Sequence, residues 1–437
     1  MSGKYTVASA DGLPLLGNLP EFVRDPTDAM EAWASEGDIV ELDIASRSPY
    51  FVTDPGVIED ILISNSQKVT IGPEQQQLFD GVAAKSVSVS TGDDWQRRRQ
   101  VMMGPFTGKK ATSYREDMIA EAVKHVEGWT DGQRFQLRRE MRELTVPMLT
   151  KALHGLDVEG GPSTLIAATD AVEERARFSR PGRYAPDWVP TLADIRFDRR
   201  AAELEAYIDE VIQRQRESDI DGTVCATLLE ASDNGFLSEE EVRENLIGIM
   251  FGGNTSPSGV MMNAWRMLTE HPSLHDRLLE EYEQVVDGEF SPADVDDLEL
   301  TEATISETLR MYPPFLAINR RATEPFSVDG FQFEPGDEIW LSQWVVHRDE
   351  EYWDDPEQFD PDRWLEEADR PKFAHFPFGG GPRVCPGRLI AMQQMTIALA
   401  VTVGRADLQM DPKVPLDFKT AMNLKAKETI EATVSLR

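Results

Sequence analysis

A short segment near the C-terminus limits, more than any other, what this chain can fold into. Residues 376–388 read Phe-Pro-Phe-Gly-Gly-Gly-Pro-Arg-Val-Cys-Pro-Gly-Arg, and the apolar run that follows predicts a helix from about Leu389 to Val403. The glycines allow the loop backbone to approach a flat partner closely. The segment delivers Cys385 to a helix N-terminus, where backbone N–H groups and the helix dipole stabilise a thiolate.

Other uses of Cys385 fit this segment less well. A phosphate-binding loop needs Gly-Lys-Ser/Thr after its glycines, whereas this loop continues Pro-Arg-Val-Cys. A cysteine nucleophile needs a nearby histidine, and His375 stands upstream with no orienting Asn or Asp evident. A buried structural cysteine is the commonest fate of a lone cysteine, but it does not explain the glycines or the flanking arginines.

The charge balance and the cysteine count exclude several classes of protein. The 437 residues include 44 Lys and Arg against 78 Asp and Glu, and the net charge of -34 argues against nucleic acid or an anionic membrane as partner. This charge indicates either simple solubility or halophilic adaptation, because salt screens repulsion between surface carboxylates. With only Cys225 and Cys385, and no signal peptide or long apolar run, we expect a cytoplasmic protein without disulfides or a membrane anchor.

The order of the predicted elements favours an α+β or mainly α fold. Helical periodicity dominates between about residues 95 and 315, and we expect strands only in the flanking parts. Alternating apolar residues around Asp329-Gly330 predict one hairpin. We therefore expect one domain over residues 1–437, with a β-rich part at about 1–70 and 320–345.

One predicted helix is unusually long and is interrupted in its middle. Ser238 and Glu241 have capping-box spacing, and the apolar pattern that follows runs past Trp265. The segment Phe251-Gly-Gly-Asn-Thr-Ser-Pro257 places two glycines and a proline where a helix prefers neither, and the proline cannot donate to the carbonyl of Gly253. Such a breach indicates either a ligand passing the helix or a tolerated kink.

At this point the sequence resembles a known family. Residues 378–387 resemble the haem-binding signature of cytochromes P-450, F-x-x-G-x-R-x-C-x-G. Glu307-Thr-Leu-Arg310 resembles the family's E-x-x-R, and residues 359–364 resemble the segment that supplies a second arginine. The succession of these motifs over about residues 238–400 is also similar to the family's. The resemblance implies the cytochrome P-450 fold, in which the long helix crosses a haem b group.

The resemblance also implies a role for individual residues around that haem. Cys385 is the implied axial ligand of the iron. The implied loop residues beside the porphyrin are Phe378, Gly379 and Gly387. The implied partners of the haem propionates are Trp95 and Arg99, from the family's W-x-x-x-R, with Arg320 and Arg383. The implied clamp behind the haem is Glu307 held between Arg310 and Arg363.

The chain departs from the family in the middle of the long helix. Most members carry an acid–alcohol pair for proton delivery within A-G-x-D/E-T, but this chain reads Gly252-Gly-Asn-Thr-Ser256 and has no carboxylate there. One alignment puts Thr255 at the acid position and Ser256 at the alcohol. The other puts Asn254 at the alcohol, as in the sterol and bile-acid hydroxylases and prostacyclin synthase. Protons then pass through water held by Ser256, Thr255 or the Gly253 carbonyl, or else the enzyme uses peroxide or rearranges an oxygenated substrate.

The resemblance implies a monomeric monooxygenase that uses O2 and a separate ferredoxin or flavin-type electron donor on a mainly apolar lipid, steroid or terpenoid. We expect a loop at Ile71–Thr91 over the haem, with Phe79 lining a pocket, and an access lid within residues 178–188. Arg97, Arg98 and Arg388 are candidates for a basic docking patch for the donor. The rival hypotheses are a peroxygenase or isomerase, a haem sensor without turnover, and a helical scaffold without haem.

Overall fold

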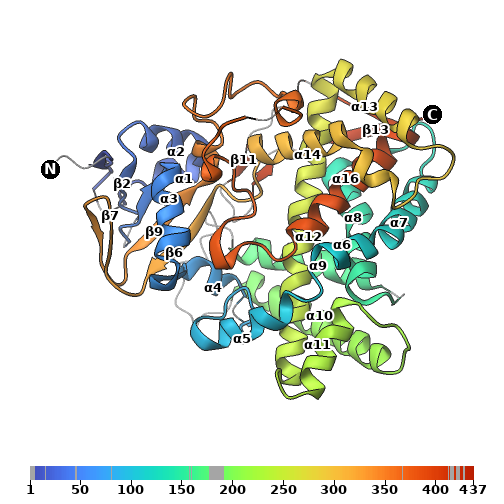
Figure 1. Cartoon of the computed structure of the whole chain (residues 1–437), viewed down its shortest axis with the longest axis horizontal. Helices are drawn as coiled ribbons and strands as arrows, with labels where there is room; N and C mark the ends of the chain where they lie inside the picture. The colour runs from blue at the N-terminus through green and yellow to red at the C-terminus, as the bar shows by residue number, and fades with distance from the viewer. Residues whose placement is uncertain are drawn as a thin grey trace.

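The computed structural model shows a β-rich part beside a larger helical part (Figure 1). It describes residues 5–14, 16–44, 47–79, 81–156, 158, 160–176, 191–366, 368–411, 413, 418–419, 424–426 and 429–437. Helices dominate the middle of the chain, so the predicted mainly α class is confirmed. Among the described residues, no helix is both long and apolar enough to cross a bilayer.

A six-stranded mixed sheet forms the β-rich part. Its strands, in spatial order, are β1 (Val7–Ser9), β2 (Ile39–Glu41), β3 (Tyr50–Val52), β9 (Glu338–Ser342), β6 (Ala317–Ala322) and β4 (Val69–Ile71). The short helices beside its N-terminal strands are α1 (Leu19–Arg24), α2 (Pro26–Ala34) and α3 (Pro55–Glu59). Because β6 and β9 come from the second half of the chain, this sheet joins residues that are far apart in sequence.

The predicted Asp-Gly hairpin is confirmed. Strands β7 (Phe326–Val328) and β8 (Phe331–Phe333) pair in antiparallel fashion around Asp329 and Gly330. Both turn residues have positive φ, 42° and 94°, which is the backbone of the type I′ turn that matches the twist of a hairpin.

The predicted confinement of strands to the flanks is wrong at one place. Strand β5 (Arg134–Gln136) lies inside the helical region and pairs with β13 (Glu431–Leu436), which in turn pairs with β10 (Ala406–Met410). A three-residue strand that pairs with the C-terminus leaves no local periodicity for sequence reasoning to detect. A further small hairpin joins β11 (Phe418–Lys419) to β12 (Lys425–Ala426).

The long central helix α12 (Glu239–Glu270) runs through the helical part (Figure 1). Its capping box is formed as predicted: the Ser238 hydroxyl accepts from the Glu241 N–H, and the Glu241 carboxylate accepts from the Ser238 N–H. The helix continues through Pro257 without a break. It packs against α8 (Leu137–His154), α9 (Gly161–Ala176), α14 (Glu299–Met311) and α16 (Arg388–Arg405).

The remaining helices surround this core. They are α4 (Pro73–Phe79), α5 (Gly92–Met102), α6 (Gly108–Ser113), α7 (Arg115–Glu127), α10 (Leu192–Arg216), α11 (Val224–Asp233), α13 (Pro272–Val285) and α15 (Gln343–Val346). The predicted helix after the cysteine segment is confirmed as α16. In Figure 1 the loop that precedes α16 lies between the sheet and α12.

Candidate active site

The cysteine loop, residues 376–387, folds into two successive tight turns before α16. The Gly379 N–H donates to the Phe376 carbonyl at 2.8 Å, and the Val384 N–H donates to the Gly381 carbonyl at 3.0 Å. The Cys385 N–H donates back across the loop to the Phe378 carbonyl at 2.9 Å. Gly381 has φ 67°, and a Cβ there would lie 2.0 Å from the Leu62 carbonyl oxygen. The glycine is therefore required both by the backbone conformation and by close contact with the chain after α3.

The Cys385 side chain is exposed although it lies within the helical part of the protein. Protein atoms surround it, yet its side chain remains accessible to solvent. Burial raises the pKa of the Cys385 thiol, while the Gly387 N–H and the guanidinium groups of Arg99 and Arg388 act in the opposite direction.

A stripe of small residues on α12 also faces open space. Gly252 is exposed in the middle of an otherwise buried helix, and no atom lies within 4 Å of a Cβ built at Gly252 or Gly259. Ser256, which is half-buried, stands between them at helical spacing on the same face. The helix backbone is therefore accessible along Gly252, Ser256 and Gly259.

The other candidates for proton delivery lie differently. Asn254 is fully buried, and its amide donates to the Thr169 hydroxyl of α9 at 2.8 Å, so its side chain is directed away from the open stripe. Thr255 is also buried, and Gly253 packs against Leu149 of α8. Ser256 therefore lies on the accessible face of α12 and Asn254 on the opposite side, because helical geometry puts residues two apart on nearly opposite faces.

Three arginines converge near the cysteine loop without a carboxylate partner. Arg99 of α5 donates to the Val384 carbonyl at 2.7 Å, Arg320 of β6 to the Asn319 carbonyl at 2.9 Å, and Arg383 to the Ser90 carbonyl at 2.9 Å. None of the three forms an ion pair with any Asp or Glu that the structure describes. Burial, together with a neighbouring arginine in each case, lowers the pKa of Arg320 and of Arg383 to about 10.

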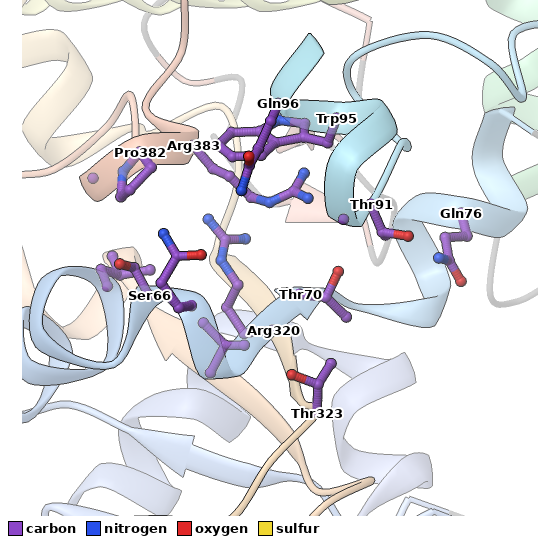
Figure 2. A pocket seen from close by; sticks show the side chains of 15 residues that line it. Ser66, Thr70, Gln76, Thr91, Trp95, Gln96, Arg320, Thr323, Pro382 and Arg383 are labelled. Atoms are coloured by element: carbon purple, nitrogen blue, oxygen red, sulfur yellow. The ribbon is translucent and has the colours of Figure 1, made fainter. Parts of the chain in front are cut away.

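Two of these arginines, Arg320 and Arg383, line a cavity of about 360 Å³ (Figure 2). The guanidinium groups of Arg320 and Arg383 enter the same space, and that of Arg383 lies 4.3 Å from the centre of the Trp95 ring. The Thr70 hydroxyl at the cavity wall is buried without a hydrogen-bond partner. A cavity with unpaired buried cations and an unsatisfied hydroxyl fits an anionic group such as a pair of carboxylates.

Glu307 of α14 is the centre of a buried polar cluster. Its carboxylate accepts from Arg310 Nε and Nη2 at 2.9 and 2.8 Å, and from Arg363 Nε at 3.1 Å. The indole N–H of Trp364 at 2.8 Å and the Asp360 N–H at 3.0 Å complete five donors to one fully buried carboxylate. The spacing of the sequence motifs gives no indication of the Trp364 contact, since it depends on a turn formed only in the fold.

Comparison with known proteins assigns this arrangement. The family model for cytochrome P450 matches residues 8–433. The chain belongs to the cytochrome P450 family. Cyclooctatin synthase from Streptomyces melanosporofaciens is 28% identical, over 97% of this chain and 94% of that protein.

Two further relatives have similar coverage. Pentalenene oxygenase from Streptomyces avermitilis is 27% identical over 93% of this chain and 92% of its own length. Lanosterol 14-alpha demethylase from Bos taurus is 26% identical over 88% of this chain and 78% of its own length. The protein is thus a cytochrome P450 oxidoreductase, of a family that binds haem.

The expected basic docking patch is wrong for two of its three arginines. Arg97 and Arg98 both donate to Glu241 of α12, at 2.5 and 2.9 Å, and Arg98 is buried. The Arg97 guanidinium is the main cause that lowers the pKa of Glu241 to about 2. In this P450 these side chains fasten α5 to α12, whereas Arg388 is exposed.

The segment between α4 and α5 lies over the N-terminal half of α12. The Val87 N–H donates to the Asn245 amide oxygen at 2.8 Å, and the Lys85 N–H and ammonium bind Glu244 and Glu240. Phe79 meets Phe251 edge to face, with ring centroids 6.2 Å apart. The access lid expected within residues 178–188 lies outside the described residues.

Proposed function

We propose that this P450 is a cytoplasmic, monomeric haem-thiolate monooxygenase that uses O2 to hydroxylate an apolar small molecule, with a terpenoid as the favoured class. The observation that supports it best is the exposed Cys385 thiol on a loop beside which three arginines without carboxylate partners converge. Haem b has an iron atom that binds a thiolate and two propionate carboxylates that pair with arginines. Cys385 and the three arginines therefore match the groups of haem b.

In this proposal the thiolate of Cys385 holds the iron and the arginines hold the propionates. Bound haem supplies the activation of dioxygen. The propionates would be the anionic partners of Arg99, Arg320 and Arg383, which have no ion pair among the described residues. Trp95 also contacts the Arg383 guanidinium by a cation–π interaction. The exposed backbone at Gly252 leaves room for small ligands beside α12.

We assign proton delivery to Ser256, because it is the hydroxyl on the open stripe of α12. Pro257 has no N–H, so the Gly253 carbonyl lacks its usual helical donor and can hold a water molecule. Together these groups can pass a proton although the acid of most family members is missing here. Thr255, which is buried, is a second candidate.

The names of the relatives favour a terpenoid or sterol-like substrate. They include a cyclooctatin synthase, a pentalenene oxygenase and a lanosterol demethylase. Phe79, Val87 and Val89 are apolar residues of the segment that lies over α12, and they are suited to such a ligand. Steroids and other lipids are the alternative classes.

We place the docking site of a ferredoxin or flavin-type donor on the surface outside the cysteine loop. Arg388 and Lys109 are exposed there, and neither has an ion pair among the described residues. Two exposed apolar side chains lie close to these cations in the sequence: Leu389, 38% accessible, follows Arg388, and Met103, 37% accessible, precedes Lys109 by six residues. Exposed cations beside apolar contacts are suited to a small acidic electron carrier.

Donor-driven and peroxide-driven turnover separate the proposal from its rivals. We expect product from a panel of terpenoids with NADH, a ferredoxin and its reductase, and little product with hydrogen peroxide alone. Turnover with peroxide alone would favour a peroxygenase instead. A haem-containing protein that shows no spin-state change across the panel would favour a sensor.

The same assay tests Ser256. We expect Ser256→Ala to lower product formation by ~100-fold, the range of a lost proton donor, with more NADH consumed for peroxide release. Ser258→Ala is the matched control, because its hydroxyl is buried and donates to the Asn254 and Thr255 carbonyls. Equal product per NADH in Ser256→Ala and wild type would remove Ser256 from the mechanism.

We also propose halophilic adaptation, on the basis of the net charge of -34. Raising KCl from about 0.1 M to about 1 M shortens the Debye length from about 10 Å to about 3 Å, so repulsion between carboxylates weakens. The midpoint of thermal unfolding should therefore rise by several degrees in KCl, and by more than in an uncharged osmolyte at equal osmolarity. An unchanged or lower midpoint in KCl contradicts the proposal.

A further inference from the structure

The Glu307 cluster reaches the cysteine loop only through an intermediate residue. Arg310 Nη1 donates to the His347 carbonyl at 2.8 Å, and Arg310 and Arg363 donate to the Gln358 carbonyl at 3.2 and 3.4 Å. Among the described hydrogen bonds, none from Glu307, Arg310 or Arg363 ends on the cysteine loop. A hydrogen-bonded connection between the Glu307 cluster and the cysteine loop therefore needs a further residue between them.

His347 and Gln343 supply that contact. The Phe376 N–H, at the first residue of the cysteine loop, donates to His347 Nε2 at 3.0 Å. The Gln343 side-chain amide donates to the carbonyl of the same residue, Phe376. His347 and Gln343 lie on one turn, because the His347 N–H donates to the Gln343 carbonyl at 3.0 Å, and both side chains are fully buried. The peptide groups on both sides of Phe376 are thus held from one short helix.

The bond to Phe376 requires a neutral imidazole. His347 Nε2 accepts a hydrogen bond, so its proton stands on Nδ1. Burial, followed by His375, Arg348 and Arg310, lowers the pKa of His347 well below the ordinary range. The ring of His375 lies 5.0 Å from that of His347, and its own pKa is lowered to about 3 by burial and by Arg310 and Arg370.

We propose that His347 is a positioning residue for Cys385: its neutral ring holds the Phe376 amide, connects the Glu307 cluster to the cysteine loop, and releases the loop when it is protonated. The inference rests on the proposed ligation of haem by Cys385. A protonated ring would turn an N–H toward the Phe376 N–H, so the acceptor would be lost and two donors would face each other.

The sign of the pH dependence follows from the neutral folded state. A histidine whose pKa is lowered by folding stabilises the fold fully above its unfolded pKa of about 6.5, and this contribution is lost as the pH falls below that value. Thiolate ligation should therefore weaken on the acid side and not on the alkaline side. The charged or titratable groups that face His347 are Arg310 from α14, Arg348 from the chain after α15, and His375 from before the loop.

Two variants of the haem-loaded protein separate hydrogen bonding from shape. His347→Phe keeps a ring but removes the acceptor, whereas His347→Gln keeps an acceptor that does not titrate. At pH 7 we expect His347→Phe to lose the thiolate-type reduced carbon monoxide band on the order of tenfold faster than wild type, with His347→Gln close to wild type. Amide hydrogen exchange of residues 372–378 should rise by a similar factor in His347→Phe only. His275→Gln, a buried histidine on α13, is the matched control.

Below pH 6 wild type should lose the band progressively, and His347→Gln should lose it more slowly. If His375→Gln, and not His347→Gln, removes the acid sensitivity, or if His347→Phe matches wild type in both measurements, the inference is overturned. If His347→Phe does not fold, the loss of the thiolate-type band below pH 6 in wild type and in His347→Gln still tests the inference. A wild type without the thiolate band would instead refute the proposed function, while amide exchange at residues 372–378 still tests the bond between His347 and Phe376.

Discussion

The Cys385→Ser variant should lose the thiolate-type band of the reduced carbon monoxide complex completely, together with donor-driven turnover. Cys385 carries the one soft donor atom of the cysteine loop, and its side chain is exposed. A serine hydroxyl is a much weaker electron donor to iron than a thiolate, so the signature of the ligand disappears even if some haem remains bound. The measurement is the difference spectrum of wild type and variant at equal haem content.

Cys225→Ala is the control for this experiment. Cys225 is fully buried in the apolar core on α11, and burial raises the pKa of its thiol to about 12. We expect this variant to retain the band, since its sulfur packs among apolar side chains. Retention of the band in Cys385→Ser would refute the assignment of the ligand, and with it the proposed function.

Glu307→Gln should remove a large part of the stability of the fold. The variant leaves the guanidinium groups of Arg310 and Arg363 buried, 0% and 7% exposed, without their shared carboxylate. Breaking a buried ion pair in this way costs about 3–5 kcal/mol, a large part of the 5–15 kcal/mol typical of a domain. Urea denaturation followed by far-UV circular dichroism measures the loss of unfolding free energy, and haem retention should fall with it.

An exposed pair of the same chemistry provides the matched control. Arg277 donates to both oxygens of Asp362 at 3.0 and 2.5 Å, but the two side chains are about half exposed. Asp362→Asn should therefore cost less than about 1 kcal/mol, because water screens the pair. If Glu307→Gln and Asp362→Asn lose equal unfolding free energy, burial does not determine how much the Glu307 cluster stabilises the fold.

Local sequence patterns predicted the elements that depend on local chemistry. The capping box at Ser238 and Glu241, the turn at Asp329-Gly330 and the helix after Cys385 are each determined by residues that are close in sequence. These patterns work because the hydrogen bonds concerned span only a few residues. The positions of Arg320 and Arg383 near one another followed from the family resemblance, not from any local pattern.

Sequence reasoning failed where a side chain had a choice of distant partners. Arg97 and Arg98 look like a solvated basic turn, yet both are held by Glu241, more than a hundred residues away. Asn254 took the alcohol position in one of two possible alignments, and only the position of Thr169 on α9 shows that its amide is already engaged. His347 had no signal at all, because its function depends on a backbone N–H.

The close approach of Gly381 to Leu62 has a consequence for how this protein can be engineered. Because only a hydrogen atom fits between the loop and the Leu62 carbonyl, the loop that carries the cysteine rests directly on the N-terminal part of the chain. The N-terminal part of the chain is thus in direct backbone contact with the cysteine loop. Chimaeras of related oxygenases that exchange the first seventy residues need to preserve this backbone contact as strictly as the cysteine itself.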